Sequence, residues 1–306
     1  MQTSLTVQVP ATSANCGPGF DTFGVACTLY NTITISWSEP DEVSLTVTGE
    51  GAGLLKQGER NLAVKAVRRV LAEVGRERRG FTLVMDNKIP LSRGLGSSSA
   101  AIVGGMTSVN ALLGNPLDRG KIFELANELE GHPDNVCPAI YGGMTVSFMD
   151  GKKPRCVKLE PPGELNMVVV VPDFTLSTNV ARNALPNLVS HQDAVFNVSR
   201  AALFVAAICK EDLNLLRFSL HDKLHQQYRS KFIPGMDDVL AAADKAGALG
   251  GFISGSGPAL MAFARAGADL DGIGEAMRGE FIKHGSDAVY HRLSFDLDGA
   301  KISARQ

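Results

Sequence analysis

The chain has 306 residues, 44% of them hydrophobic, which is enough for two domains that each bury a core. Acidic and basic side chains nearly cancel to a formal net charge of -2, so we expect neither nucleic acid nor a membrane as a partner. No apolar run approaches the roughly 20 residues of a membrane span, and the N-terminus lacks a signal-peptide pattern. A cytoplasmic protein is therefore expected, and its scattered cysteines, without a C-x-x-C pair, argue against disulfides or zinc: Cys16, Cys27, Cys137, Cys156 and Cys209.

The first part of the chain has the pattern of a sheet with helices. Alternating apolar and polar residues predict strands at residues 4–10, 31–37, 43–49 and 80–86. Apolar residues at helical spacing predict helices at residues 61–75, 98–113 and 119–130. Two further strands, at residues 141–148 and 165–173, flank a Gly/Pro/Lys-rich stretch that we interpret as a turn or hinge.

The second part again mixes helices and strands. Helices are predicted at residues 193–209, 212–226, 235–247 and 269–283, and strands at residues 249–254, 258–264 and 287–293. No internal repeat or low-complexity tract interrupts them, so the class is α+β or α/β in two parts. We place the boundary in the hinge, which gives domains at 1–155 and 156–306.

The most informative segment lies between a predicted strand and an apolar helix. Small residues let the backbone approach a polyanion, and the free N–H groups at the helix start bind anions, so phosphate is the expected ligand. The segment is not the usual P-loop G-x-x-x-x-G-K-S/T, because serine follows the second glycine. A flexible connecting loop is the alternative. Its residues are Pro90, Leu91, Ser92, Arg93, Gly94, Leu95, Gly96, Ser97, Ser98, Ser99 and Ala100.

Two more glycine-rich segments carry polar residues. In PATSANCGPGFD, at residues 10–21, Asn15 and Asp21 flank a Gly-Pro-Gly turn that is able to aim both side chains into one cavity. In SGSGPA, at residues 254–259, the turn lies between two short apolar strands. A simple turn and a tight hairpin are the alternatives.

The three segments, in this order, resemble the three signatures of the GHMP kinases, the superfamily of galactokinase, homoserine kinase and mevalonate kinase. The strings PATSANCGPGFD and ISGSGPA are similar to the homoserine kinase versions, and so is GHPDNV at residues 131–136. The resemblance covers about residues 6 to 265. It implies an N-terminal ATP-binding domain with a left-handed β-α-β unit that resembles part of a ribosomal protein, and a ferredoxin-like C-terminal domain.

The resemblance also implies functional residues. Residues 90–100 would wrap the ATP phosphates, with the third motif beside them: Ser254, Gly255, Ser256 and Gly257. L-Homoserine would be the second substrate, and the family commonly forms homodimers. The residues implied for homoserine are Asn15, Asp21, His132, Asn135, Arg182 and Arg229. The two arginines suit a carboxylate, and Asp21 suits the ammonium group or the hydroxyl.

Magnesium is implied with ATP, because phosphoryl transfer needs a hard cation on the phosphates. The family's glutamate ligand precedes the histidine turn, and we favour Glu130, with Glu128 and Glu124 as alternatives and Ser98 as a hydroxyl ligand. Asn135, Glu130 and Asp21 are the candidate catalytic residues. An amide cannot take a proton, so catalysis would depend on alignment and charge stabilisation.

Other interpretations remain open at this point. One is a GHMP enzyme for another small alcohol, or a diphosphate decarboxylase; another is a GHMP-derived sensor that binds ATP without transferring phosphate. The spacing of His221 and His225 permits a metal site, but no accompanying glutamate supports it, so an exposed helix face is favoured. Cys16, inside the first motif, is interpreted as a packing residue.

Overall fold

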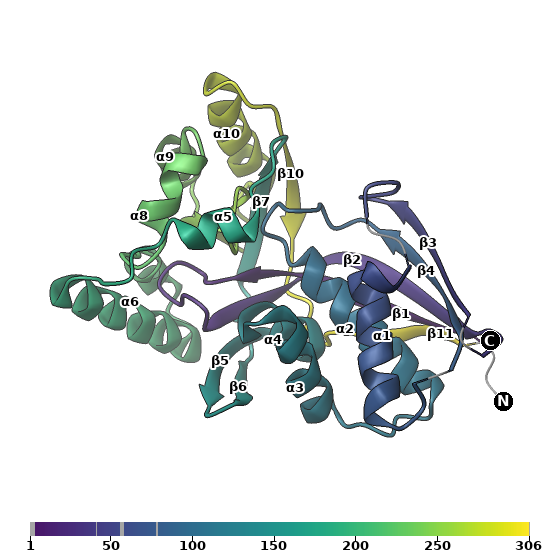
Figure 1. The fold of residues 1–306 in the computed structure, drawn as a ribbon. Helices are drawn as coiled ribbons and strands as arrows, with labels where there is room; N and C mark the ends of the chain where they lie inside the picture. Colours follow the sequence, from purple (N-terminus) through teal and green to yellow (C-terminus); the bar gives the residue numbers. More distant parts are fainter. Residues whose placement is uncertain (1–3, 41, 56–57, 78, 306) are drawn as a thin grey trace.

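The computed structural model describes residues 4–40, 42–55, 58–77 and 79–305. The strands form two sheets, one of seven strands and one of four, each covered by helices (Figure 1). Both sheets combine with helices in the way expected of an α+β protein.

The first sheet has the strand order β11-β1-β2-β4-β3, and the β5-β6 hairpin pairs with β2. Neighbouring strands are antiparallel except β3 and β4, which are parallel and joined through α1 as a β-α-β unit. The strands are β1 (Ser4–Ala14), β2 (Phe23–Trp37), β3 (Val43–Gly49), β4 (Phe81–Asn87), β5 (Met144–Asp150), β6 (Lys153–Leu159) and β11 (Lys301–Arg305).

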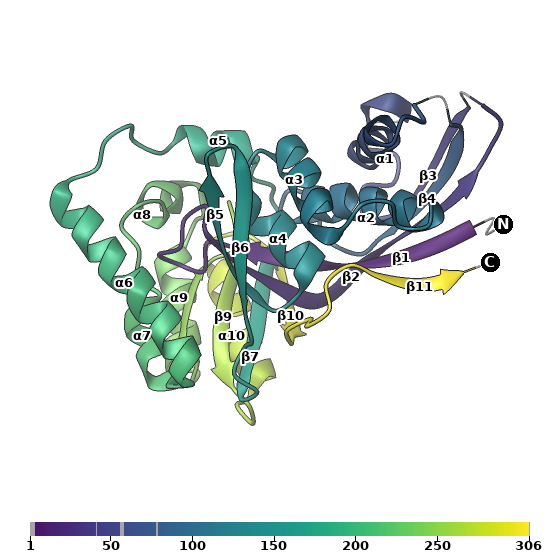
Figure 2. The same ribbon diagram turned by 90° about the horizontal axis from the view of Figure 1, so that it is seen from below.

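Four helices belong to this sheet, and α1, α2 and α3 lie together on one side of β1 and β2 (Figure 2). Alternate residues of β1, among them Leu5, Val7 and Val9, are fully buried, which explains the alternating pattern in the sequence. The helices are α1 (Leu62–Glu73), α2 (Ser97–Leu112), α3 (Arg119–Glu130) and α4 (Pro133–Tyr141), and the short η1 (Gly58–Arg60) precedes α1.

The second sheet is antiparallel in the order β10-β7-β9-β8. Helices lie between β7 and β8 and between β9 and β10 in the chain, so the connectivity is the β-α-β-β-α-β of ferredoxin-like domains. Its main elements are β7 (Leu165–Pro172), β8 (Gly250–Ile253), β9 (Leu260–Arg265), β10 (Ala288–Leu293), α9 (Met236–Lys245) and α10 (Leu270–Lys283). The remaining helices of this part are α5 (Thr178–Asn183), α6 (His191–Lys210), η2 (Leu213–Leu215), α7 (Leu216–Ser219), α8 (Gln226–Arg229) and η3 (Ser230–Phe232).

One hydrophobic core runs through both parts of the molecule. A row of rings connects β2 to the second sheet: Phe23 stacks on Phe204 with centroids 5.0 Å apart, and Phe204 and Phe295 lie 6.4 and 6.3 Å from Phe263. Aromatic pairs at these distances add to the energy of apolar burial. These rings pack the two sheets against each other.

Three sequence-based interpretations differ from the structure. The stretch that we interpreted as a turn or hinge contains β6, so the boundary placed between residues 155 and 156 falls inside a strand, and β11 returns to pair with β1. The single helix predicted at residues 212–226 is wrong, because the segment forms η2 and α7 and then an irregular turn. In that turn the carboxylate of Asp222 accepts backbone N–H groups of Leu224, His225 and Gln226, which competes with helix formation.

The third difference concerns α6. Among the helices of the described residues, α6 alone is both long enough and apolar enough to cross a membrane, judged by length and composition only. Its mean hydropathy is 1.2. Our expectation from the sequence was that no segment reached that length. In the structure α6 buries Phe204, Ala207 and Ile208 in the core, and the buried Asn197 donates to Pro18 O at 2.7 Å. These contacts make α6 an integral helix of the second part.

Candidate active site

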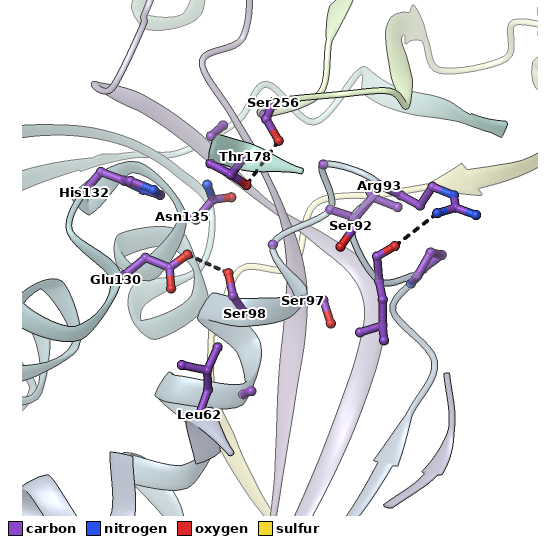
Figure 3. Close-up of a pocket in the computed structure, with 18 of the residues that line it drawn as sticks. Leu62, Ser92, Arg93, Ser97, Ser98, Glu130, His132, Asn135, Thr178 and Ser256 are labelled. Atoms are coloured by element: carbon purple, nitrogen blue, oxygen red, sulfur yellow. Dashed lines mark hydrogen bonds between the residues drawn. The ribbon is translucent and has the colours of Figure 1, made fainter. Parts of the chain in front are cut away.

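A pocket of about 550 Å³ lies where the two parts of the chain meet, and Figure 3 shows side chains from both parts around it. Most of the residues singled out in the sequence line it: Asn15, Asp21, residues 90–98, Glu130, His132, Asn135, Arg182, Arg229, Gly255 and Ser256. The others lie outside its lining: Ser99, Ala100, Glu124, Glu128, Ser254 and Gly257. One cavity thus collects residues that are dispersed over the whole chain.

The glycine-serine loop presents backbone to one end of the pocket. Gly94 and Gly96 have positive φ angles of 81° and 68°, and Gly96 is the N-cap of α2 without a side-chain capping bond. The first N–H groups of α2 are therefore available to an anion. A Cβ at Gly96 would clash with the side chain of Thr12, so the loop tolerates no larger residue there.

The third motif, at residues 254–259, forms hydrogen bonds that hold this loop in place. Ser254 Oγ lies 2.7 Å from Gly94 O, and Ala259 N donates to Arg93 O at 3.2 Å. The Arg93 guanidinium donates to the carbonyls of Pro172 and Asp173 at 2.9 and 2.7 Å, at the end of β7. The side chain of Arg93 thus ties the loop to the second sheet.

Glu130 meets the start of α2. Its Oε1 accepts a hydrogen bond from Ser98 Oγ at 2.6 Å (Figure 3). It accepts a second from Ser99 Oγ at 3.0 Å. The two alternative glutamates make other contacts, Glu128 with Arg69 at 3.1 Å and Glu124 with Lys121 at 3.9 Å. Of the three carboxylates, Glu130 is the one beside the helix N-terminus.

The donor set at Glu130 fits a hard cation only in part. A carboxylate and a hydroxyl oxygen within 2.6 Å are suitable ligands for Mg²⁺. The described residues contain no group of three or more His, Cys, Asp and Glu side chains that would hold a metal. A cation here would thus take most of its ligands from nucleotide phosphates and water, as magnesium usually does.

The N-terminus of α4 places polar groups between the two ends of the pocket. Thr12 Oγ1 donates to Asn135 Oδ1 at 2.8 Å, and the buried carboxylate of Asp134 lies 3.1 Å from His132 Nδ1. Burial lowers the pKa of His132, but the hydrogen bond and charge of Asp134, with a smaller contribution from Glu130, outweigh it and raise the pKa.

Two arginines form the far end of the pocket. Arg182 makes a bidentate ion pair with Asp21, at 2.9 and 2.8 Å, and its hydrogen bond with Asp21 raises the pKa of Arg182. Arg229 is 2% exposed, and burial, followed by the charge of Arg182, lowers its pKa to about 10. Both guanidinium groups lie over the ring of Phe20, that of Arg182 at 5.5 Å and that of Arg229 at 5.2 Å from the ring centroid.

Asn15 shapes the loop that carries Asp21. With a φ of 73°, it donates from Nδ2 to Gly255 O at 2.8 Å and accepts from Asp21 N at 3.0 Å. Asn tolerates this left-handed conformation better than most residues, which explains its position before the Gly-Pro-Gly turn. The amide therefore joins the first motif to the third.

Sequence reasoning missed several residues of the site. Asp134, Thr12 and Phe20 adjoin residues that were assigned, and their place inside the same motifs was the available signal. An apolar wall of the pocket, formed by Leu54, Leu62, Met85 and neighbours, had no signal in the sequence. The buried Cys16 agrees with its interpretation as a packing residue.

The interpretation of His221 and His225 as an exposed helix face is wrong for the second residue. His225 is fully buried, whereas His221 is exposed, and the two histidines do not share a helix. The turn held by Asp222 directs His225 inward, toward the first motif.

Comparison with known proteins places this chain in a family. Family models match residues 61–143, as the GHMP kinases N terminal domain, and residues 204–283, as GHMP kinases C terminal. The homoserine kinase of Moorella thermoacetica is 48% identical over 296 residues, which cover 97% of this chain and 99% of that protein. The chain belongs to the homoserine kinase family of the GHMP kinases. The homoserine kinase of Carboxydothermus hydrogenoformans, 44% identical over 94% of this chain and 93% of that protein, agrees.

Solved structures confirm the predicted two-domain GHMP kinase fold. The homoserine kinase of Cytophaga hutchinsonii has a TM-score of 0.92 at 32% identity, over 99% of this chain and 98% of that chain. The L. major mevalonate kinase in complex with R-mevalonate has a TM-score of 0.71 at 17% identity, over 97% and 96% of the two chains. The second likeness concerns the fold alone.

Proposed function

We propose that this member of the homoserine kinase family transfers the γ-phosphoryl group of ATP to the side-chain hydroxyl of L-homoserine. The observation that carries the proposal is the arrangement of one pocket. One end of the pocket is lined by the N-terminus of α2 and the glycine-rich backbone before it. The other end is lined by Asp21, Arg182 and Arg229. A polyanion and a zwitterionic amino acid are the ligands that match these two ends.

At the phosphate end, the N–H groups of residues 94–98 would bind the phosphates of ATP, and Ser98 and Glu130 would hold Mg²⁺. Bound there, magnesium supplies positive charge to the phosphate oxygens during transfer. The protein's own contribution is a preorganised anion site, because hydrogen bonds of Thr12 N, Arg93 and Ser254 hold the loop.

At the other end, the carboxylate of homoserine would lie against Arg229, which forms no ion pair within the described part of the chain and has hydrogen bonds only to neutral acceptors. The carboxylate of Asp21 would accept a hydrogen bond from the ammonium group of homoserine, and its ion pair with Arg182 would keep that arginine aligned. The substrate's hydroxyl would then point toward the pair formed by Thr12 and Asn135, between the two ends of the pocket. Alignment, rather than a dedicated base, would drive the transfer.

The test is ADP release from Mg-ATP with homoserine, mevalonate, shikimate and galactose as acceptors. We expect turnover with homoserine and rates at least tenfold lower with the other three, because none of them carries both an ammonium group and a carboxylate. ATP binding without turnover of any acceptor would favour a sensor. Turnover of another alcohol in preference to homoserine would favour a different GHMP kinase.

We also propose a cytoplasmic homodimer. Free cysteines, with no disulfide in the described residues, support a reducing setting. The exposed apolar residues Leu188, Val195 and Val198, on α6 and just before it, offer a surface for a second copy. Light scattering on the purified protein tests the assembly, and a Val198→Asp variant should shift it toward the monomer.

A further inference from the structure

We propose that His225 is a positioning residue for homoserine: it holds the guanidinium of Arg229 in the pocket through its unprotonated Nδ1 and is itself fixed to the first motif through its Nε2–H group. This inference rests on the proposed function and adds to it a residue that does not line the pocket. Three observations carry it: the burial of both side chains, the direction of their hydrogen bonds, and the aromatic stack around them.

Arg229 is a buried cation with an unusual set of partners. Its Nη1 donates to Gly255 O at 3.0 Å and to His225 Nδ1 at 3.2 Å, and its Nε donates to Ala181 O at 3.4 Å. None of the ion pairs within the described ranges includes Arg229. All three partners are neutral, so its charge remains available to a ligand anion, and the partners only set its direction.

The tautomer of His225 follows from its two neighbours. An arginine N–H group can only donate, so Nδ1 must be unprotonated, and Gly17 O, at 2.8 Å from Nε2, can only accept, so Nε2 must carry the hydrogen. Both ring nitrogens are thus used, and the ring connects Arg229 to the loop of Gly17, which lies 208 residues before His225 in the chain. A second tautomer would break both bonds at once.

The surroundings keep the ring neutral. Burial lowers the pKa of His225 to about 4; Asp222 opposes the shift, Arg229 adds to it, and Gly17 and Asp21 oppose it weakly. Asp222 Oδ2 lies 3.7 Å from Nε2 but is already occupied by backbone N–H groups. At neutral pH the ring therefore accepts from Arg229 rather than repelling it.

Phe20 extends the arrangement to the substrate loop. Its ring stacks on His225 with centroids 5.3 Å apart and 30° between the planes, and its other neighbours are the guanidinium groups of Arg182 and Arg229. Because Phe20 adjoins Asp21, the histidine fixes the carboxylate-binding arginine and the ammonium-binding aspartate relative to each other. Homoserine would thus meet a preorganised site.

Two substitutions of His225 test the roles of its two ring nitrogens separately. In His225→Asn the amide oxygen takes the place of Nδ1 and can accept from Arg229, whereas in His225→Gln the amide nitrogen takes the place of Nε2 and can donate to Gly17 O. We expect His225→Gln to raise the homoserine KM about 10-fold or more, with kcat and the ATP KM within about twofold, since a hydrogen bond to a charged group is lost. His225→Asn should keep the homoserine KM within about threefold of wild type, and the exposed His221→Gln should leave it unchanged.

Equal losses in the Asn and Gln variants, or a loss that falls on kcat or on the ATP KM, would overturn the role given to His225. A measurement on the wild-type protein covers variants that fail to fold: ¹⁵N-histidine NMR at pH 7 should show His225 neutral with Nε2 protonated, and a charged ring or the Nδ1–H tautomer would refute the proposal. Absence of homoserine turnover by the wild type would overturn the proposed function, and the positioning role with it. An active wild type with unaffected variants would overturn the positioning role alone.

Discussion

The two ends of the pocket differ in the chemical groups that line them. The proposed phosphate end includes one continuous segment, residues 90–98, and the uncapped main-chain N–H groups at the start of α2. The proposed amino-acid end consists of charged side chains from separate places in the chain: Asp21 and Arg182 are aligned by a partly buried ion pair, and Arg229 by buried hydrogen bonds. In the proposed function, one end would recognise the phosphates that any nucleoside triphosphate offers, and the other would recognise the charges of one class of substrate.

This difference determines which substitutions each end of the pocket can tolerate. The backbone site depends on glycine conformations and on the absence of side chains, so added volume is its main hazard. The side-chain site depends on charge and direction, so a lost partner is its main hazard. Substitutions at the two ends should therefore affect different kinetic constants.

Substitution at the proposed metal position should have the largest effect, because Glu130 is the carboxylate that accepts a hydrogen bond from Ser98 at the start of α2. Glu130→Gln keeps the shape but removes the charge, and we expect kcat at limiting magnesium to fall about 100-fold or more. The thermal midpoint without ligands should stay or rise, because the side chain lies at the C-terminal end of α3, where a negative charge is unfavourable.

Glu128→Gln is the matched control, since Glu128 pairs with Arg69 outside the pocket. We expect this variant to keep wild-type activity across a magnesium titration monitored by ADP release. If Glu128→Gln or Glu124→Gln loses activity while Glu130→Gln keeps it, the metal ligand lies earlier on α3 than Glu130.

Added volume at the loop comes next. Gly96→Val should weaken ATP binding or turnover at least about tenfold, because the residue has a positive φ and its Cβ would meet Thr12. Ser98→Ala should act in the same direction through the lost hydroxyl. Gly114→Ala, with a φ of 86° but no atom within 4 Å of an added Cβ, is the control for backbone strain alone. Wild-type ATP kinetics in a folded Gly96→Val protein would sink the assignment of this loop.

The arginines test the other end of the pocket. Arg182→Ala and Arg229→Ala should each raise the homoserine KM about 10- to 150-fold and leave the ATP KM within a few-fold, since each loses a charge-assisted hydrogen bond of about 1.5–3 kcal/mol. Arg292→Ala removes an exposed ion pair with Asp271 and should change neither constant. If ATP affinity falls instead, the two arginines bind the nucleotide, and the proposed contrast between a phosphate end and an amino-acid end is wrong.

The same contrast explains how far the sequence alone could lead. The phosphate loop was predicted from adjacent residues, because a strand, a glycine-rich turn and a helix N-terminus follow one another in the chain. Most strands and helices were predicted for the same reason, from alternation and helical spacing within short windows. The assignment of Arg182 and Arg229 to the substrate came from the family resemblance and not from any local pattern, whereas the Gly-Pro-Gly turn beside Asp21 had already indicated that its side chain faces a cavity.

What the sequence could not supply depends on contacts between distant residues. The burial of His225 follows from Gly17 and Phe20, and the break in the predicted helix at residues 212–226 follows from the side chain of Asp222. The return of β11 to β1 pairs the last strand of the chain with the first. None of these features has a signal in spacing or composition, because each depends on the tertiary fold.

The smallest expected effect concerns His132, which lies between the two ends of the pocket. Its pKa is raised in the folded protein, so the protonated form gains stability from Asp134 that the unfolded chain lacks. This contribution is fully present below the unfolded pKa of about 6.5 and is lost as the pH rises through the folded pKa. We expect the unfolding free energy of the wild type, relative to His132→Gln, to fall by about 1 kcal/mol or less over that range.

Urea unfolding of both proteins at a series of pH values measures this difference directly. The sign is diagnostic, because a histidine whose pKa was lowered, as that of His225 is, would make the wild type lose stability toward acid instead. A relative stability that rises with pH between about 6 and 8 would therefore mean that burial outweighs Asp134 at His132. In that case the junction between the two ends of the pocket is held by neutral hydrogen bonds, and the charged part of the site begins only at Asp21 and the arginines.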